Sequence, residues 1–347
     1  MEVVKPMPKS IGKLNAVPAA LILTVILVVL FVFSFVLGRY PISPMDVLKI
    51  LSSHLLHIGQ VTLGIIDTVV MQIRLPRILA AMVVGASLAL AGVSFQGLFR
   101  NPLVSPDILG VSSGAGFGAA LAILLGGNQL AIQVTAFGFA LLAVGISYSI
   151  SKMVKGNPTL SLILAGMAIA SLFGALLSLV KYVADPVNQL PAITYWLMGS
   201  LASVGQKSLL YAAVPMLIGI TVLILIRWRF NVLAMGEEEA KALGVDTGRL
   251  RIIIVVCCTM ITASAVCISG TIGWVGLVIP HIGRALVGPD HKKLLPVCLL
   301  IGAAFLLLID DIARVVASVE IPIGILTAIV GIPFFVFLLK RGGRGWA

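Results

Sequence analysis

The sequence predicts an all-α integral membrane protein with about ten membrane-spanning helices. Three observations lead to this fold class: 60% of the 347 residues are hydrophobic, only 11% are charged, and the apolar residues form long continuous runs. A soluble fold could not cover this much apolar surface with so few charged side chains. A helix needs roughly 20 mostly apolar residues to cross the hydrocarbon core, and runs without period-two alternation favour helices over a barrel.

Ten apolar segments are expected to form these helices. In chain order they are Val17–Leu37, Val69–Leu98, Asp107–Leu125, Leu130–Ser151, Thr159–Val183, Ser208–Ile226, Leu250–Ser269, Trp274–Leu286, Leu294–Ile312 and Ile321–Leu339. The first is longer than a signal-peptide core and lacks a clear cleavage site, so it is interpreted as a retained helix. The eighth is too short to cross comfortably and is expected to be a partial helix.

No linker or low-complexity tract divides the chain, so residues 1–347 are predicted to form a single transmembrane domain. The largest outer loop is expected at about 39–68 and the main cytoplasmic segment at about 234–248. With the N-terminus inside and ten passes, 17 of the 24 Lys and Arg residues lie on the inner side. This bias follows the positive-inside rule and predicts that both termini are cytoplasmic.

The composition and motifs also exclude several functions. The net charge of +11 is explained by cytoplasmic loops, so no nucleic-acid partner is expected. The chain has no G-x-x-x-x-G-K-[ST] loop for ATP and no H-E-x-x-H motif, and its four histidines do not converge by spacing. The four cysteines lie inside apolar runs and are interpreted as packing residues. No catalytic residue, metal ligand or bound cofactor is therefore expected in this chain.

Two alternative classes remain to be weighed. An ion-coupled secondary transporter acting without an ATPase needs ionisable groups near the middle of the membrane. Asp310, Asp311 and Glu320 fall near the outer ends of their segments, which argues against this alternative. An intramembrane enzyme would need a converging catalytic pair, and the sequence offers none.

The inner loop predicts a short cytoplasmic helix. Gly236 can open it, and Gly244, after Ala240 and Leu243, can end it. Its first turn would hold Glu237, Glu238 and Glu239, where the helix dipole favours negative charge. Such a helix suits docking of a soluble partner, and equally a solvated connector.

Several stretches resemble the FecCD-type permeases of ABC importers, which carry ferric siderophores, haem or vitamin B12. In order they are Ile73–Arg77, Gly97–Leu103, Pro106–Ala115, Leu164–Gly166, Tyr195–Gly199, Ala234–Gly236, Leu243–Gly244, Gly276–His281, Asp311–Arg314 and Glu320–Gly324. They extend over almost the whole chain from about residue 70 onward. The resemblance implies the type II ABC importer permease fold and import of a ferric siderophore or similar large metal chelate, such as haem or cobalamin, across the cytoplasmic (inner) membrane.

The resemblance also implies partners. These are a second permease copy or a paralogue, two cytoplasmic ATPase subunits that hold ATP and Mg, and an extracytoplasmic substrate-binding protein. The segment Gly236–Gly244 then corresponds to the ATPase-coupling element. Arg74, Arg77 and Arg314 correspond to positions that dock the binding protein; by themselves they would suit interfacial snorkelling or, for Arg314, a pair with Asp310.

The cytoplasmic gate is implied at Thr159, Leu160 and Ser161. Helix capping by Asn157, with Pro158 at the first helical position, explains these residues equally well. The pore walls are expected to be small and apolar, because a large chelate needs a wide passage that binds it weakly.

Overall fold

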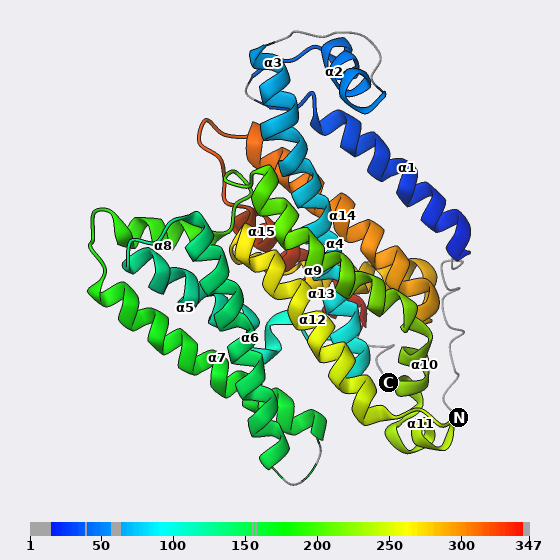
Figure 1. The fold of residues 1–347 in the computed structure, drawn as a ribbon. Helices are drawn as coiled ribbons and strands as arrows, with labels where there is room; N and C mark the ends of the chain where they lie inside the picture. The colour runs from blue at the N-terminus through cyan, green and yellow to red at the C-terminus, as the bar shows by residue number, and fades with distance from the viewer. Residues whose placement is uncertain (1–14, 39, 57–63, 155, 157, 343–347) are drawn as a thin grey trace.

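The computed structural model describes residues 15–38, 40–56, 64–154, 156 and 158–342, and this part of the chain contains helices and no strand. Seven helices are long and apolar enough to cross a membrane. They are α1 (Ala16–Ser34), the continuous rod Ile65–Phe99, α6 (Gln129–Met153), α7 (Pro158–Val183), α9 (Gln206–Leu225), α12 (Thr247–Ser269) and α14 (His291–Val315). The rod consists of α3 (Ile65–Thr68), the π-helical η1 (Val69–Arg74) and α4 (Leu75–Phe99) (Figure 1).

Three further apolar helices are shorter and coincide with the three remaining expected segments. They are α5 (Val111–Leu124), α13 (Val275–Val287) and α15 (Ile323–Gly342). The predicted all-helical membrane fold is therefore confirmed, and each expected span falls on one of these ten segments. The remaining elements are α2 (Pro44–Leu56), η2 (Pro106–Leu109), α8 (Gln189–Met198), α10 (Arg227–Met235) and α11 (Glu237–Ala242).

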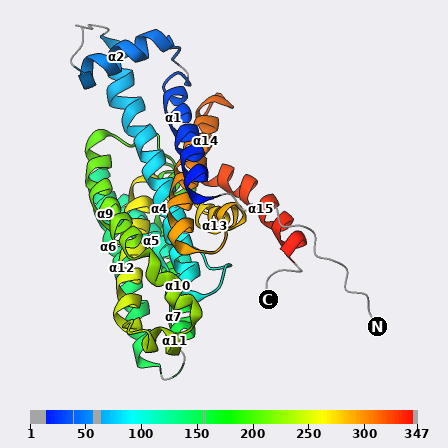
Figure 2. The ribbon, with the colours of Figure 1, turned by 90° about the vertical axis from the view of Figure 1, so that its right-hand side faces the viewer.

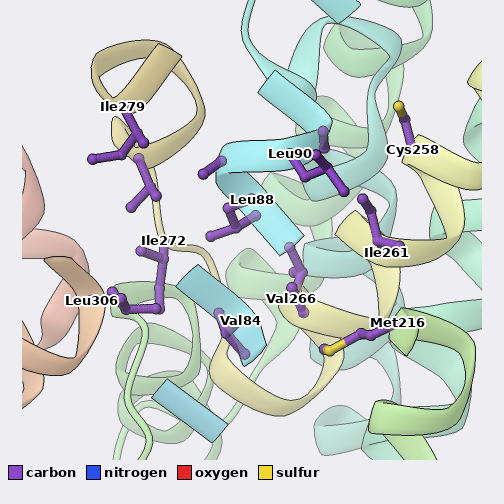
Figure 3. Packing of buried hydrophobic residues seen from close by; sticks show 14 of the residues in the cluster. Val84, Leu88, Leu90, Met216, Cys258, Ile261, Val266, Ile272, Ile279 and Leu306 are labelled. Atoms are coloured by element: carbon purple, nitrogen blue, oxygen red, sulfur yellow. The ribbon is translucent and has the colours of Figure 1, made fainter. Parts of the chain in front are cut away.

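The core of the protein surrounds α4, whose residues are nearly all buried. α12, α13 and α14 pack around it, and Figure 3 shows Leu88 and Leu90 of α4 facing the buried side chains of these helices. In contrast, α1 is peripheral and exposes one large apolar side chain after another, such as Val17, Leu21 and Val25 (Figure 2). A helix that is apolar on its exposed face suits contact with lipid.

Glycines set the closest helix contacts. A Cβ atom on Gly85 of α4 would lie 2.2 Å from the carbonyl oxygen of Gly302 in α14. A Cβ atom on Gly92 would lie 1.9 Å from the carbonyl oxygen of Gly276 in α13. These backbones touch because neither residue carries a side chain, which is how small residues allow membrane helices to approach closely.

The short helices α5 and α13 begin at a junction inside the helix bundle, at membrane depth. Gly276, at the start of α13, lies against both Gly92 of α4 and Pro106 of η2. Gly92 is seven residues before the end of α4, which corresponds to about 10 Å along the helix. The irregular segment 270–274, which includes Trp274 at φ 70°, and η2 therefore meet at membrane depth. This junction explains why α5 and α13 are short, as expected for the eighth span.

Candidate functional site

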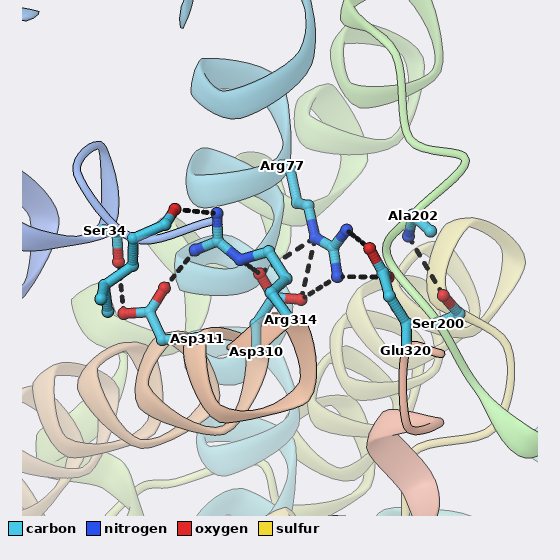
Figure 4. A network of polar contacts seen from close by, with 9 residues as sticks. Ser34, Arg77, Ser200, Ala202, Asp310, Asp311, Arg314 and Glu320 are labelled. Carbon is cyan, nitrogen blue, oxygen red and sulfur yellow. Dashed lines mark hydrogen bonds and ion pairs between the residues drawn. The ribbon is translucent and has the colours of Figure 1, made fainter. Parts of the chain in front are cut away.

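A network of buried charges lies at one end of the helix bundle. Its centre is Arg77 of α4, whose Nη2 lies 2.9 Å from Asp310 Oδ1 of α14. The same guanidinium donates from Nη1 to Glu320 Oε1 at 3.0 Å and from Nη2 to Glu320 Oε2 at 2.9 Å. Figure 4 shows Arg77 between the two carboxylates, so that one side chain joins α4, α14 and the segment before α15.

The network continues to α1 through the last turn of α14. Arg314 Nε lies 3.2 Å from Asp310 Oδ2, which is the expected i,i+4 pair, and Arg314 also contacts Asp311. Ser34 at the end of α1 donates its hydroxyl hydrogen bond to Asp311 at 2.5 Å (Figure 4). Buried charges persist only when they are paired and hydrogen-bonded, and here the carboxylates of Asp310 and Asp311 meet this condition.

The three arginines expected to dock a binding protein all lie at this end. Their exposed fractions are 4% for Arg74, 7% for Arg77 and 5% for Arg314. Arg74 donates to the backbone carbonyls of Phe35 and Tyr40, and the other two bind carboxylates of the same chain. The side chains are thus occupied within the chain in this conformation, and the docking role stays a prediction.

The expected short helix after Gly236 is present at the opposite end of the bundle. α11 spans Glu237–Ala242, begins at Gly236 with φ 140° and ends before Gly244 with φ 78°. Both glycines adopt conformations that side-chain-bearing residues rarely take, as expected for the residues that open and close this helix. Ala240 is fully buried and Leu243 is exposed. α10, which precedes α11, is an additional helix that the sequence pattern does not predict.

The three glutamates of α11 have different environments. Glu237 lies 3.1 Å from Arg251 of α12 and 3.5 Å from Lys241, whereas Glu238 and Glu239 are exposed. Partial burial by itself raises the pKa of Glu237, but the nearby Arg251 and Lys241 and the hydrogen bonds to its carboxylate lower it more, so the net pKa is lowered. Glu237 therefore stays ionised at neutral pH and attaches α11 to α12, whereas the side chains of Glu238 and Glu239 make no such attachment and stay exposed.

The expected gate residues begin α7. Thr159 is half-buried, Leu160 is exposed and Ser161 is buried. Pro158 is the first residue of α7, as the capping alternative requires, and Asn157 lies outside the described residues. This placement fits either interpretation, so the gate also stays a prediction.

Two cavities lie on the side of the protein formed by α8 and α15. The deeper one, about 740 Å³, lies at the membrane-depth junction between Asp107 of η2, Trp274 and α15. The outer one, about 560 Å³, lies between α8 and Glu320, and Met198 and Ile325 line both. The cavities therefore adjoin one another from the buried-charge network to the membrane interior.

Asp107 is an acidic residue at this junction that the sequence pattern does not point out. The pattern places Asp310, Asp311 and Glu320 near the outer ends of their segments, whereas Asp107 lies at membrane depth and accepts a hydrogen bond from Ser112. Asp107 begins the expected segment Asp107–Leu125, but in the structure it lies in η2, which precedes α5 and packs against Gly276 of α13. Within the described residues no group of three or more His, Cys, Asp or Glu side chains is arranged to hold a metal ion.

Seven apolar helices of spanning length, short helices that meet inside the bundle and cavities beside them identify the chain as a multi-pass membrane protein. Residues 26–341 match the FecCD transport family, and the chain belongs to this family. It is thus an ABC importer permease.

Individual relatives support this assignment over most of the chain. The molybdate import system permease protein MolB of Haemophilus influenzae is 45% identical over 92% of this chain and 96% of its own. A vitamin B12 import system permease protein, BtuC of Escherichia coli O157:H7, is 41% identical over 79% of this chain and 84% of its own. A solved structure described as an inward-facing metal-chelate type ABC transporter is 42% identical with a TM-score of 0.84, covering 93% of this chain and 99% of that one.

Proposed function

We propose that this permease imports a ferric chelate or a similar large metal chelate, together with a second permease chain, two ATPase subunits and an extracytoplasmic binding protein. ATP and Mg would be held by the ATPase subunits. The end with α10 and α11 would face the cytoplasm, with both termini on that side, and the buried-charge network would face outward. This orientation agrees with the distribution of basic residues along the sequence.

The observation that carries the proposal is the uncovered face of α7. A stripe of small side chains, Ala168, Ser171, Ala175 and Ser178, is exposed along this helix beside exposed larger residues such as Leu164, Leu172 and Leu179. Both serine hydroxyls donate to carbonyls of their own helix, which reduces their attraction for a passing solute. This small-residue stripe, rather than the larger side chains beside it, suits a wide passage that releases its solute. A second copy facing α7 would enclose this passage.

The substrate is proposed on the pore wall and on the relatives. A small, weakly polar wall fits a bulky chelate better than a small ion, which would need a ring of close ligands. Among the relatives, one from Helicobacter pylori, 41% identical, is named a probable iron chelatin transport system permease protein. The relative named for molybdate makes this oxyanion the second candidate.

Reconstitution tests the substrate. The permease, its ATPase and its binding protein are placed in proteoliposomes, and uptake of a ⁵⁵Fe-labelled hydroxamate chelate is compared with uptake of ⁹⁹Mo-molybdate and labelled cobalamin. We expect ATP-dependent accumulation of the iron chelate above that of the other two. Preferential molybdate uptake would replace the substrate proposal, and uptake driven by an ion gradient without nucleotide would overturn the importer mechanism.

Charge reversal tests the coupling element. Changing Glu238 and Glu239 to Lys is expected to reduce the amount of co-purified ATPase by roughly tenfold or more, because like charges across an interface cost several kcal/mol. The measurement is the molar ratio of ATPase to permease after affinity purification in detergent.

The matched control is Asp46→Lys, a charge reversal on α2 at the other end of the bundle. It is expected to leave this ratio unchanged. Equal ratios in all three proteins would show that these glutamates do not contact the ATPase.

A further inference from the structure

α10 is fastened to the first turn of α14 by a group of four side chains. Phe230 and Asn231 come from α10, Asp290 caps α14, and His291 begins it. We call these four residues the α10–α14 clamp. The sequence analysis assigned no role to them, because they are 60 residues apart in the chain.

The side-chain amide of Asn231 both donates and accepts hydrogen bonds in the clamp. Its Nδ2 donates to Asp290 Oδ1 at 2.6 Å, and its Oδ1 accepts from the backbone N–H of His291 at 2.8 Å. The same Oδ1 lies 3.0 Å from Nδ1 of the His291 ring. Asp290 also accepts from the backbone N–H of Lys292, which caps α14. The hydrogen bond from Asn231 is the main reason that the pKa of Asp290 is lowered, so its carboxylate is ionised at neutral pH.

Packing closes the clamp from the other side. The fully buried ring of Phe230 stacks on His291 with 5.6 Å between centroids and 16° between planes. A Cβ atom on Gly97 of α4 would lie 2.7 Å from His291 Nε2 and 3.1 Å from Phe230 Cδ1. α4 therefore touches both rings, and interiors packed this closely transmit displacement instead of absorbing it.

The clamp gives the segment α10–α11 a second attachment to the bundle. α11 is joined to α12 by Glu237 and Arg251, and α10 is joined to α14 by the clamp. α14 has 25 residues and is about 37 Å long. Its far end carries Asp310, Asp311 and Arg314 of the buried-charge network. One continuous helix therefore connects α10 to the opposite end of the molecule.

We propose that Asn231 is a positioning residue that passes movement of the ATPase-coupling segment to α14. This inference rests on the proposed function, in which an ATPase docks at α10 and α11. Asn231 does not contact the solute or the nucleotide. It holds α10 and α14 in a fixed relative position, so that a shift of α10 also shifts α14, whose far end carries the buried-charge network.

An exchange of the two polar groups tests the proposal. Asn231→Asp places two carboxylates side by side and removes the donor to Asp290. In the reconstituted complex we expect at least a roughly tenfold loss of ATP-dependent ⁵⁵Fe-chelate uptake, equivalent to about 1.4 kcal/mol, while the ATPase still co-purifies and hydrolyses ATP. The double variant Asn231→Asp with Asp290→Asn restores a donor facing an acceptor and keeps a good helix cap, so uptake is expected to recover to at least half.

The control is Asn101→Asp, which also lies at this end of the bundle. Its side chain only accepts from the backbone N–H of Leu103, a role that Asp performs as well, so uptake is expected to be unchanged. Wild-type uptake by Asn231→Asp, or a double variant no better than the single one, would overturn the proposal. If the single variant does not fold, Asn231→Ala is used instead, and the measured quantity is the ATP-dependent change in backbone hydrogen exchange of α14. A change equal to that of the wild type would also overturn the proposal. Absence of ATPase from the wild-type complex would instead refute the proposed function.

Discussion

Asp310→Asn is expected to lower the free energy of unfolding by about 3 kcal/mol, because it removes the buried carboxylate that Arg77 and Arg314 share and leaves each with one carboxylate, Glu320 or Asp311. Asp310 is fully buried and lies within ion-pair distance of both Arg77 and Arg314. An asparagine of the same size keeps the packing but supplies no negative charge. The loss is therefore electrostatic, and it falls on the joint between α4 and α14. Thermal unfolding of the purified protein in detergent measures it.

Asp185→Asn is the control for this prediction. Asp185 is an exposed carboxylate between α7 and α8 that accepts a hydrogen bond from the backbone N–H of Asn188, and asparagine can accept the same bond. Its unfolding midpoint is expected to stay close to that of the wild type. A midpoint for Asp310→Asn equal to that of this control would mean that Arg77 and Arg314 are held adequately by Glu320 and Asp311 alone.

Gly85→Ala is expected to cost about 3 kcal/mol or more, at the upper end of the range for overpacked cores. The added methyl group would lie 2.2 Å from the Gly302 carbonyl oxygen and 2.7 Å from Leu306 Cβ. The carbonyl belongs to a helical backbone and cannot rotate away, so α4 and α14 must separate. The amount of folded, monodisperse protein after size-exclusion chromatography and its thermal midpoint report the effect.

Gly138→Ala makes the same chemical change in a different environment. Gly138 lies within α6, and a Cβ atom there meets nothing within 4 Å. The higher helix propensity of alanine is expected to leave stability unchanged or raise it by about 0.5–1 kcal/mol. Equal effects of the two substitutions would contradict the close approach of α4 to α14.

The sequence predicted those features that depend on local pattern. Long apolar runs located the ten spans, and Gly236 and Gly244 located both ends of α11. The alternation of the predicted spans also assigned the segment Gly236–Gly244 and the three arginines to opposite ends of the bundle. The clamp and α11 lie at one end, and Arg77, Asp310 and Glu320 lie together at the other.

The features that depend on long-range contacts could not be predicted. Arg77 and Asp310 are 233 residues apart, and no local pattern shows that an arginine near a helix start meets a carboxylate near another helix end. The arginines were therefore interpreted as facing outward, whereas the structure buries them. The clamp escaped detection for the same reason, since neither an asparagine after an apolar span nor a histidine at a helix start is distinctive. The docking, coupling and gate roles stay predictions.

The length of the rod Ile65–Phe99 fixes how the protein must sit in its bilayer. Its 35 residues extend about 52 Å, and a tilt of about 55° would be needed to hide them all in a hydrocarbon layer of about 30 Å. Observed tilts rarely exceed about 40°, so the first turns must project into water. The 25 residues of α4 alone, about 37 Å, fit with a tilt of about 37°. The lipid boundary then falls beside Arg74 and Arg77, where the phosphate headgroups begin.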